Sequence, residues 1–223
     1  IMTRIRFRLC CIKYLYDNLL IVTDQYKTIA APSEGTYKAK GSKFTGFAIP
    51  VFSEEEFKEH LARIKKENPN SGHYCYGFRI GADNKLYRYS DDGEPSSTAG
   101  KPIFGQIQSF ELSNIMIVVT RYFGGTKLGV GGLITAYRAA AKEAIENATI
   151  INRTVDNVYE IQFGYHIMSE VMNLIKKQEL EVISQTLEET GTIQFRIRQS
   201  EAENIMEQLE KIESLKVQFL KTI

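Results

Sequence analysis

The sequence has 223 residues, of which 43% are hydrophobic and 25% are charged, as is usual for a soluble globular protein. This composition excludes a disordered chain, and the length suits one large domain or two small ones. The net charge of +1 conceals an uneven distribution, since residues 1–153 carry a balance of +6 and residues 154–223 a balance of −5. A polyanion is therefore expected to bind the first part of the chain.

The first 22 residues mix basic and apolar side chains and match no single element. An uncharged run of about 18 residues is missing, which disfavours a membrane span, and a clean signal peptide is also missing. We interpret residues 1–22 as an extension or a misassigned start, with an added strand or a surface helix as the alternative. Three cysteines without a disulfide or zinc pattern indicate a reducing compartment, so we expect a cytoplasmic protein that does not contact membranes.

Residues 23–150 are predicted to form an N-terminal α/β domain. After a polar lead-in, Phe44 to Val51 predicts a strand, which Gly46 and Pro50 favour at the edge of a sheet. Ser53 then begins a helix, and the glutamate three residues later completes a capping box.

A hairpin and a strand–loop–helix follow. Alternating residues over 73–80, then 86–90, predict two paired strands. Pro102 suits the first turn of a short helix. The apolar run Ile115 to Val119 predicts a buried strand, and helical spacing over 133–148 predicts the next helix.

Five glycines lie in the predicted turn between this strand and this helix. Such a turn exposes backbone N–H groups beside a helix N-terminus, which favours an anion such as phosphate. The alternative is that the glycines only permit close packing of the helix on the sheet. Neither the P-loop nor the G-x-G-x-x-G spacing is present, which disfavours a nucleotide enzyme of either type. The predicted anion-binding and nucleic-acid-binding residues, including basic and aromatic neighbours, are Lys101, Arg121, Tyr122, Gly124, Gly125, Lys127, Gly129, Gly131, Gly132, Arg138 and Lys142.

Outside the turn, this surface is extended by Lys101 in the short predicted helix and by Arg138 and Lys142 in the helix over 133–148. Basic and aromatic groups beside an anion-binding loop fit phosphate contacts with base stacking. A solvated helix face is the alternative, because the basic residues are few.

A polar loop over 90–102 forms a second candidate site. Its carboxylates could perform acid–base chemistry or hold Mg²⁺, but Asp-Gly and Glu-Pro are also ordinary turn chemistry, and we favour the structural role. We identify no catalytic residue, metal site or cofactor, and we expect Cys75 to be buried and inert. The residues of this possible polar site are His73, Ser90, Asp91, Asp92, Glu94 and Thr98.

Residues 154–223 predict a C-terminal domain in the order β-α-β-β-α-β, which is the ferredoxin-like arrangement. Ser200 with Glu203 is expected to cap its second helix. In the strand over 192–198, polar residues alternate with Ile193, Phe195 and Ile197, so one sheet face is solvated. That face is a possible protein-binding surface or simply bare.

Four segments together resemble the IMPACT/YigZ family: Tyr89 to Pro102, Val119 to Leu133, Ser42-Lys-Phe44 and His73-Tyr-Cys75. The resemblance covers roughly Tyr26 to Phe219 and points to a bacterial two-domain member. It implies a two-layer N-terminal domain similar to the fourth domain of elongation factor G and to GHMP kinases. It also implies a ferredoxin-like domain similar to the fifth domain of that factor, and an overall α+β fold.

The resemblance implies a function less directly. Eukaryotic members regulate translation through a partner of an initiation-factor kinase, using a further domain. Bacterial members are suspected of binding RNA or ribosomes. We therefore expect a cytoplasmic protein that binds RNA or the ribosome and possesses an anion-binding glycine loop. The alternative is an enzyme for a small phosphorylated or nucleotide-like substrate with Mg²⁺.

Overall fold

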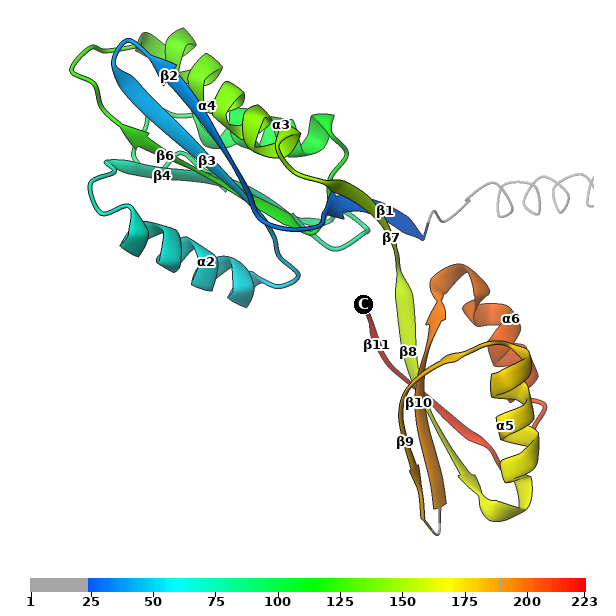
Figure 1. Ribbon diagram of the computed structural model, residues 1–223. Coiled ribbons are helices and arrows are strands. Elements are labelled where there is room, and N and C mark those ends of the chain that lie inside the picture. The colour runs from blue at the N-terminus through cyan, green and yellow to red at the C-terminus, as the bar shows by residue number, and fades with distance from the viewer. Residues whose placement is uncertain (1–23, 189) are drawn as a thin grey trace, which may run out of the picture. The chain divides into compact units, whose positions relative to one another are not determined.

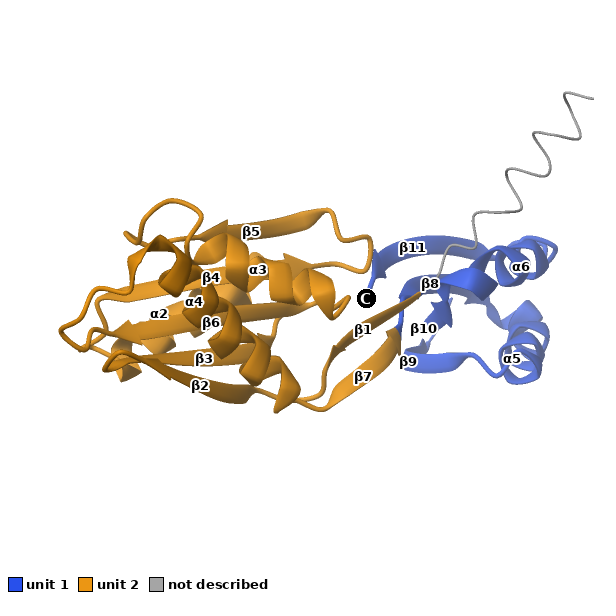
Figure 2. Cartoon of the chain, turned by 90° about the horizontal axis from the view of Figure 1, so that it is seen from above, with its two compact units in different colours: residues 1–24, 154–223 blue, residues 25–153 orange. Residues whose placement is uncertain are grey.

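The computed structural model describes residues 24–188 and 190–223, which form a mixed α/β protein of two compact units (Figure 1, Figure 2). One unit contains residues 25–153, and the other contains Asp24 with residues 154–223. The interpretation of residues 1–22 lies outside the described residues. In the described part of the chain, none of the helices has the length and apolar character needed to cross a membrane.

The unit of residues 25–153 is built on a five-stranded antiparallel sheet in the order β2-β3-β6-β4-β5. The bounds of these strands are β2 Ser33–Ala39, β3 Ser42–Pro50, β4 His73–Ile80, β5 Leu86–Ser90 and β6 Ile115–Tyr122. Two further strands, β1 (Gln25–Ile29) and β7 (Ile150–Thr154), pair with each other. Strands β4 and β5 pair antiparallel, so the predicted hairpin is present.

Helices cover both faces of this sheet (Figure 1). Helices α3 (Gly100–Ser109) and α4 (Gly129–Glu146) pack on the face that includes Ile117, and α2 (Glu54–Glu67) packs on the face that includes Met116. The predicted two-layer arrangement is therefore wrong, and this unit has three layers. The reason is visible in β6, whose apolar run is buried on both faces.

Two local predictions for this unit have different outcomes. Ser53 caps α2, since its Oγ accepts the Glu56 N–H at 3.1 Å, as predicted. The expectation that β3 lies at a sheet edge is wrong, because β3 is hydrogen-bonded to β2 and β6. Gly46 serves a different purpose there: a Cβ at this position would lie 2.6 Å from the Ala140 carbonyl oxygen of α4. The missing side chain lets the helix approach the sheet.

The second unit has the order β-α-β-β-α-β and a four-stranded antiparallel sheet in the order β11-β8-β10-β9. Its helices pack on one face of that sheet through a separate core that includes Phe163, Val171 and Phe195. The elements are β8 Asp156–Gly164, a short 3-10 helix η1 Tyr165–Ile167, α5 Met168–Lys177, β9 Glu181–Leu187, β10 Thr190–Arg198, α6 Gln199–Leu209 and β11 Lys216–Thr222.

The start of α6 differs from the sequence prediction. Ser200 lies inside the helix, and no side chain caps it locally, so the predicted Ser200–Glu203 capping box is wrong. The carboxylate of Asp24 instead accepts the Ser200 N–H at 3.2 Å and binds Arg198 through both oxygens, at 2.7 and 2.9 Å. A residue remote in sequence thus takes the place of the cap.

Candidate functional site

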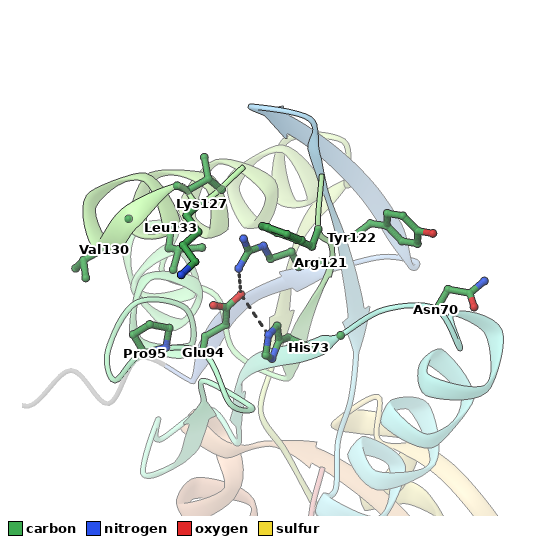
Figure 3. A pocket seen from close by; sticks show the side chains of 13 residues that line it. Asn70, His73, Glu94, Pro95, Arg121, Tyr122, Lys127, Val130 and Leu133 are labelled. Carbon is green, nitrogen blue, oxygen red and sulfur yellow. Dashed lines mark hydrogen bonds and ion pairs between the residues drawn. The ribbon is translucent and has the colours of Figure 1, made fainter. Parts of the chain in front are cut away.

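A cavity of about 660 Å³ lies where β6 ends and α4 begins (Figure 3). This volume is typical of sites that enclose one small ligand. The cavity joins residues from four separate parts of the unit of residues 25–153. Its lining consists of Asn70, Gly72, His73, Glu94, Pro95, Arg121, Tyr122, Phe123, Lys127, Leu128, Gly129, Val130 and Leu133.

The sheet register explains how the polar side chains meet. Strands β4 and β6 are antiparallel, and His73 at the start of β4 lies opposite Arg121 near the end of β6. Glu94 arrives from the polar loop that follows β5, and Lys127 comes from the segment before α4. Four of the predicted polar and basic groups are therefore brought together by strand pairing, by the polar loop and by the turn that follows β6.

Glu94 and Arg121 form a buried ion pair at the base of the cavity. The Arg121 Nη1 atom lies 2.6 Å from Glu94 Oε1, and the two side chains are 10% and 3% exposed. The same oxygen accepts a hydrogen bond from the Tyr137 hydroxyl at 2.7 Å. The Arg121 guanidinium contacts the rings of Phe44 and Phe123, with centroids at 5.6 and 5.4 Å. This pairing offsets the positive charge of Arg121, which was predicted to bind phosphate.

His73 lies beside this pair, as Figure 3 shows. Its Nδ1 lies 2.8 Å from the backbone oxygen of Asp92. A carbonyl oxygen only accepts, so Nδ1 carries a proton, and in the neutral form of the ring Nε2 then has a lone pair. Nε2 is 3.9 Å from Glu94 Oε1. The ring therefore presents a hydrogen-bond acceptor next to a carboxylate.

The other wall of the cavity is the N-terminus of α4. This helix begins at Gly129, so Gly129, Gly131 and Gly132 belong to its first turn and not to the loop, which corrects the predicted start at Leu133. Its first turn has no acidic residue, and its N-cap Leu128 has no side-chain cap. The glycines lower helix propensity, but packing of the following residues on the sheet outweighs that cost. The helix thus exposes unpaired N–H groups and the positive end of its dipole.

Two loop glycines precede this helix. Gly125 has a φ of +86°, a conformation that glycine adopts without strain. Gly124 packs against the backbone of Gly41, and its N–H is accepted by Ser42 Oγ at 3.1 Å. Both glycines are exposed, although neither lines the cavity. The turn is therefore open to solvent and held in place by the β2–β3 connection.

The remaining polar-loop residues have structural roles. Both oxygens of Asp91 accept backbone N–H groups, from Ser97 at 2.8 Å and from Ala99 and Gly100 at 2.9 and 2.8 Å, so Asp91 caps α3. Asp92 accepts the Tyr74 N–H at 2.7 Å. These contacts favour the structural interpretation of the loop.

Two smaller side chains tighten the same loop. Ser90 accepts the Asp92 N–H at 3.2 Å, and the buried Thr98 donates to the Pro95 carbonyl at 2.6 Å. Within residues 24–188 and 190–223, His, Cys, Asp and Glu side chains form no group of three suited to a metal ion. The carboxylates of Asp91 and Asp92 thus accept backbone N–H groups, whereas Glu94 binds the side chains of Arg121 and Tyr137.

Cys75 is fully buried in β4, and its thiol donates to the Asp91 carbonyl at 3.0 Å. Burial raises the pKa of this thiol to about 12. Burial likewise raises the pKa of the Tyr137 hydroxyl. Both groups are therefore protonated at neutral pH, which agrees with the expectation that Cys75 is inert.

Three predicted basic residues lie away from the cavity. Lys101 is exposed on α3, and Arg138 and Lys142 are exposed on α4, but none lines the cavity. Lys142 is 3.1 Å from Glu146, one helical turn further along. These residues could contact a longer ligand only outside the cavity.

Several lining residues were not among the predicted site residues. Phe123 and Val130 are 53% and 59% exposed, which is unusual for such apolar side chains. Their position within a glycine-rich turn was the available sequence signal. Tyr137 is buried in α4 and does not line the cavity, and its hydroxyl contact with Glu94 spans 43 residues. A single sequence carries no sign of that contact.

Comparison with known proteins identifies the family. Residues 40–145 match the domain described as the Impact N-terminal domain. The IMPACT family member YvyE of Bacillus subtilis (strain 168) is 32% identical over 154 residues, which are 69% of this chain and 71% of that protein. The IMPACT family member YigZ of Escherichia coli (strain K12) is 32% identical over 157 residues, 70% of this chain and 77% of that protein.

A crystal structure described only as that of a hypothetical protein matches 88% of this chain and 98% of its own, at 26% identity and a TM-score of 0.68. The matched domain contains the cavity-lining residues from Asn70 to Leu133. The sequence relatives extend the likeness to about 70% of the chain. The chain belongs to the IMPACT family.

Proposed function

We propose that this protein binds RNA in the cytoplasm, as free RNA or within the ribosome, and acts in translation or its regulation. The observation that carries the proposal is the pairing of an uncapped helix N-terminus with exposed aromatic side chains at one cavity. Phosphate would bind at the α4 N-terminus, and bases would stack on Tyr122 and Phe123.

The N-terminus of α4 and the side chain of Lys127 support phosphate binding. An uncapped first turn without acidic residues attracts an anion through its N–H groups and its dipole. Gly129 and Gly131 leave open space there, since a Cβ at either position would meet nothing within 4 Å. Lys127 is exposed, and within residues 24–188 and 190–223 it has no acidic partner within 4 Å. It is the cation best placed to bind a phosphate.

The exposed rings of Tyr122 and Phe123 support base stacking. These consecutive side chains are 57% and 53% exposed at the cavity rim. Exposed aromatic rings next to a phosphate site are typical of proteins that bind single strands, because every base has a stacking face. The excess of basic residues in the first part of the chain favours the same ligand.

The fold supports a place in translation. We propose that the unit of residues 25–153 is similar to the fourth domain of elongation factor G and to GHMP kinases. We likewise propose that the second unit is ferredoxin-like and similar to the fifth domain of that factor. The β-α-β-β-α-β order and the sheet order β11-β8-β10-β9 support the second assignment.

Binding can be tested by fluorescence anisotropy with a labelled single-stranded RNA at several salt concentrations. The variants are Lys127→Ala and the double change Tyr122→Ala with Phe123→Ala, and Lys66→Ala in the exposed last turn of α2 is the matched control. Lys127→Ala should weaken binding about 10-fold and lower the salt slope by about 0.7–1. The aromatic double variant should lose about 1–3 kcal/mol for each stacked base.

A substitution at α4 separates binding from folding. Gly131→Asp adds a carboxylate to the first turn of α4, where it should stabilise the helix by interacting with the positive end of its dipole, and should repel phosphate. We expect an unchanged or higher melting temperature together with about 10-fold weaker RNA binding. Ribosome co-sedimentation at two salt concentrations extends the comparison to the assembled particle. Wild-type protein that binds neither RNA nor ribosomes would overturn the proposal, as would equal affinities of Lys127→Ala and Lys66→Ala.

A further inference from the structure

The two walls of the cavity have opposite chemistry. The lining includes the carboxylate of Glu94, which is 3% exposed, together with Lys127 and the first residues of α4 (Figure 3). An anionic group is favoured at the helix end, whereas the Glu94 carboxylate, already paired with Arg121, offers it only hydrogen-bond acceptors. A ligand that fills the cavity therefore needs a negative group at one end and hydrogen-bond donors at the other.

Glu94 and His73 provide two acceptors side by side. Both protein donors to Glu94, Arg121 and Tyr137, bind Oε1, and within residues 24–188 and 190–223 no donor is bound to Oε2. His73 Nδ1 donates to the Asp92 carbonyl, so the neutral form of the ring has its Nε2 lone pair 3.9 Å from the carboxylate. Two neighbouring acceptors suit two neighbouring hydroxyl groups, as in the 2′,3′-diol of a terminal ribose.

Arg121 adds a second polar group at this wall. Its residue is 9% exposed, it lines the cavity, and its Nε has no hydrogen-bond partner in the described part of the chain. The guanidinium contacts two aromatic rings and is paired with Glu94, so it fixes the carboxylate in place. The acceptor pair is thus preorganised rather than free to turn toward solvent.

The rest of the cavity limits the size of the ligand. Pro95, Leu128, Val130 and Leu133 form an apolar lining suited to a sugar or a base. A volume of about 660 Å³ encloses one small molecule and not several consecutive nucleotides. The cavity therefore suits the end of a strand better than its interior.

We propose that the cavity binds the 3′-terminal nucleotide of an RNA strand. The 5′-phosphate of that nucleotide lies at the α4 N-terminus beside Lys127, and its free 2′,3′-diol donates to Glu94 and His73. The preceding nucleotides leave the cavity over Tyr122 and Phe123, the exposed aromatic pair at its rim. This inference rests on the proposed RNA binding and adds specificity for one end of the strand.

The test compares three forms of one RNA sequence on the full chain: linear with a 3′-diol, linear with a 3′-phosphate, and circular. We expect the diol form to bind at least about 10-fold more tightly than both others, because Glu94 offers a phosphate only hydrogen-bond acceptors and a circle has no end. Equal affinity of the circular and linear forms would overturn the inference and leave RNA binding intact. If none of the three forms binds, the proposed function fails as well.

Two variants and one competitor locate the preference. Glu94→Gln keeps a hydrogen-bond acceptor and removes the charge, so the preference for the diol over the 3′-phosphate should fall to about 2-fold or less. His73→Ala serves the same purpose if circular dichroism shows that Glu94→Gln does not fold, while Lys66→Ala should keep the full preference. A preference unchanged in both site variants would overturn the assignment to this wall. Free ribonucleoside 5′-monophosphates that bind as tightly as the strand would identify the ligand as a nucleotide and overturn the strand-end assignment.

Discussion

At the scale of single residues, the site depends on how buried charge is compensated. Arg121 and Glu94 are both buried, and each would be costly to bury alone. Pairing them lets a carboxylate remain at the base of the cavity without a solvent shell. The consequence is that Arg121 is compensated by Glu94, and the exposed Lys127 is the lining cation to which we assign the proposed phosphate contact.

Cys75 provides a prediction at the same scale. Because burial raises its thiol pKa to about 12, the reactive thiolate is scarce at pH 8. In a protein that carries Cys10→Ser and Cys11→Ser, Cys75 should react with Ellman's reagent at least about 1,000-fold more slowly than an ordinary thiol of pKa about 8.5. The rate is followed by absorbance, and unfolding in urea should restore it. Fast reaction of the folded protein would contradict the buried, protonated thiol.

At the scale of elements, the packing of α4 on the sheet depends on small residues. A Cβ on Gly46 of β3 would lie 2.6 Å from the Ala140 carbonyl, so Gly46→Ala must push the helix away. We expect a loss of about 1–3 kcal/mol in the free energy of unfolding, measured with urea. Gly105→Ala in α3 is the matched control, since a Cβ there meets nothing within 4 Å and should stabilise the helix by about 0.5–1 kcal/mol. Equal effects of the two changes would refute the close approach.

The cap of α6 gives a pH-dependent prediction. Hydrogen bonding to Arg198 lowers the pKa of Asp24 to about 2. A carboxyl group with a lowered pKa stabilises the folded state above its unfolded pKa of about 4, and that contribution disappears as the pH falls toward 2. Because Arg198 is 37% exposed, solvent screening reduces the contribution to about 1–2 kcal/mol.

Asp24→Asn should therefore destabilise the second unit by about 1–2 kcal/mol at pH 7 and by progressively less between pH 4 and pH 2. Hydrogen exchange of the α6 amides, residues 199–209, measures the effect where it arises. Glu203→Gln is the control, because Glu203 is exposed on the same helix. A difference between wild type and Asp24→Asn that stays constant from pH 7 to pH 2 would contradict this account.

How far the elements could be predicted depended on whether their determinants were local. The strand at Ile115 to Val119 and the Ser53 cap were predicted correctly, because periodicity and capping act between neighbouring residues. The edge position of β3 and the Ser200 cap were wrong, since the Gly46 contact with α4 and the Asp24 contact with α6 link distant segments.

At the scale of the whole molecule, several residues that line the cavity could be selected from the sequence, but the contacts between them could not. The glycine turn, Arg121, Lys127 and His73 could be selected from their residue types and their neighbours. The Arg121–Glu94 pair could not, because its partners are 27 residues apart and only the sheet register brings them together. The third layer was missed for a related reason: an apolar strand shows that it is buried, but not how many helices cover it.

The contacts of Asp24 also bear on how the chain may be divided. The second unit is discontinuous, since it takes Asp24 from before residues 25–153 and everything else from after them. The backbone oxygen of Asp24 accepts the Val155 N–H at 2.7 Å, so the two flanks of the intervening segment are adjacent. A polypeptide that joins Asp24 to residues 154–223 through a short linker should fold by itself. A polypeptide that starts at Thr154 lacks the Asp24 carboxylate that binds the start of α6.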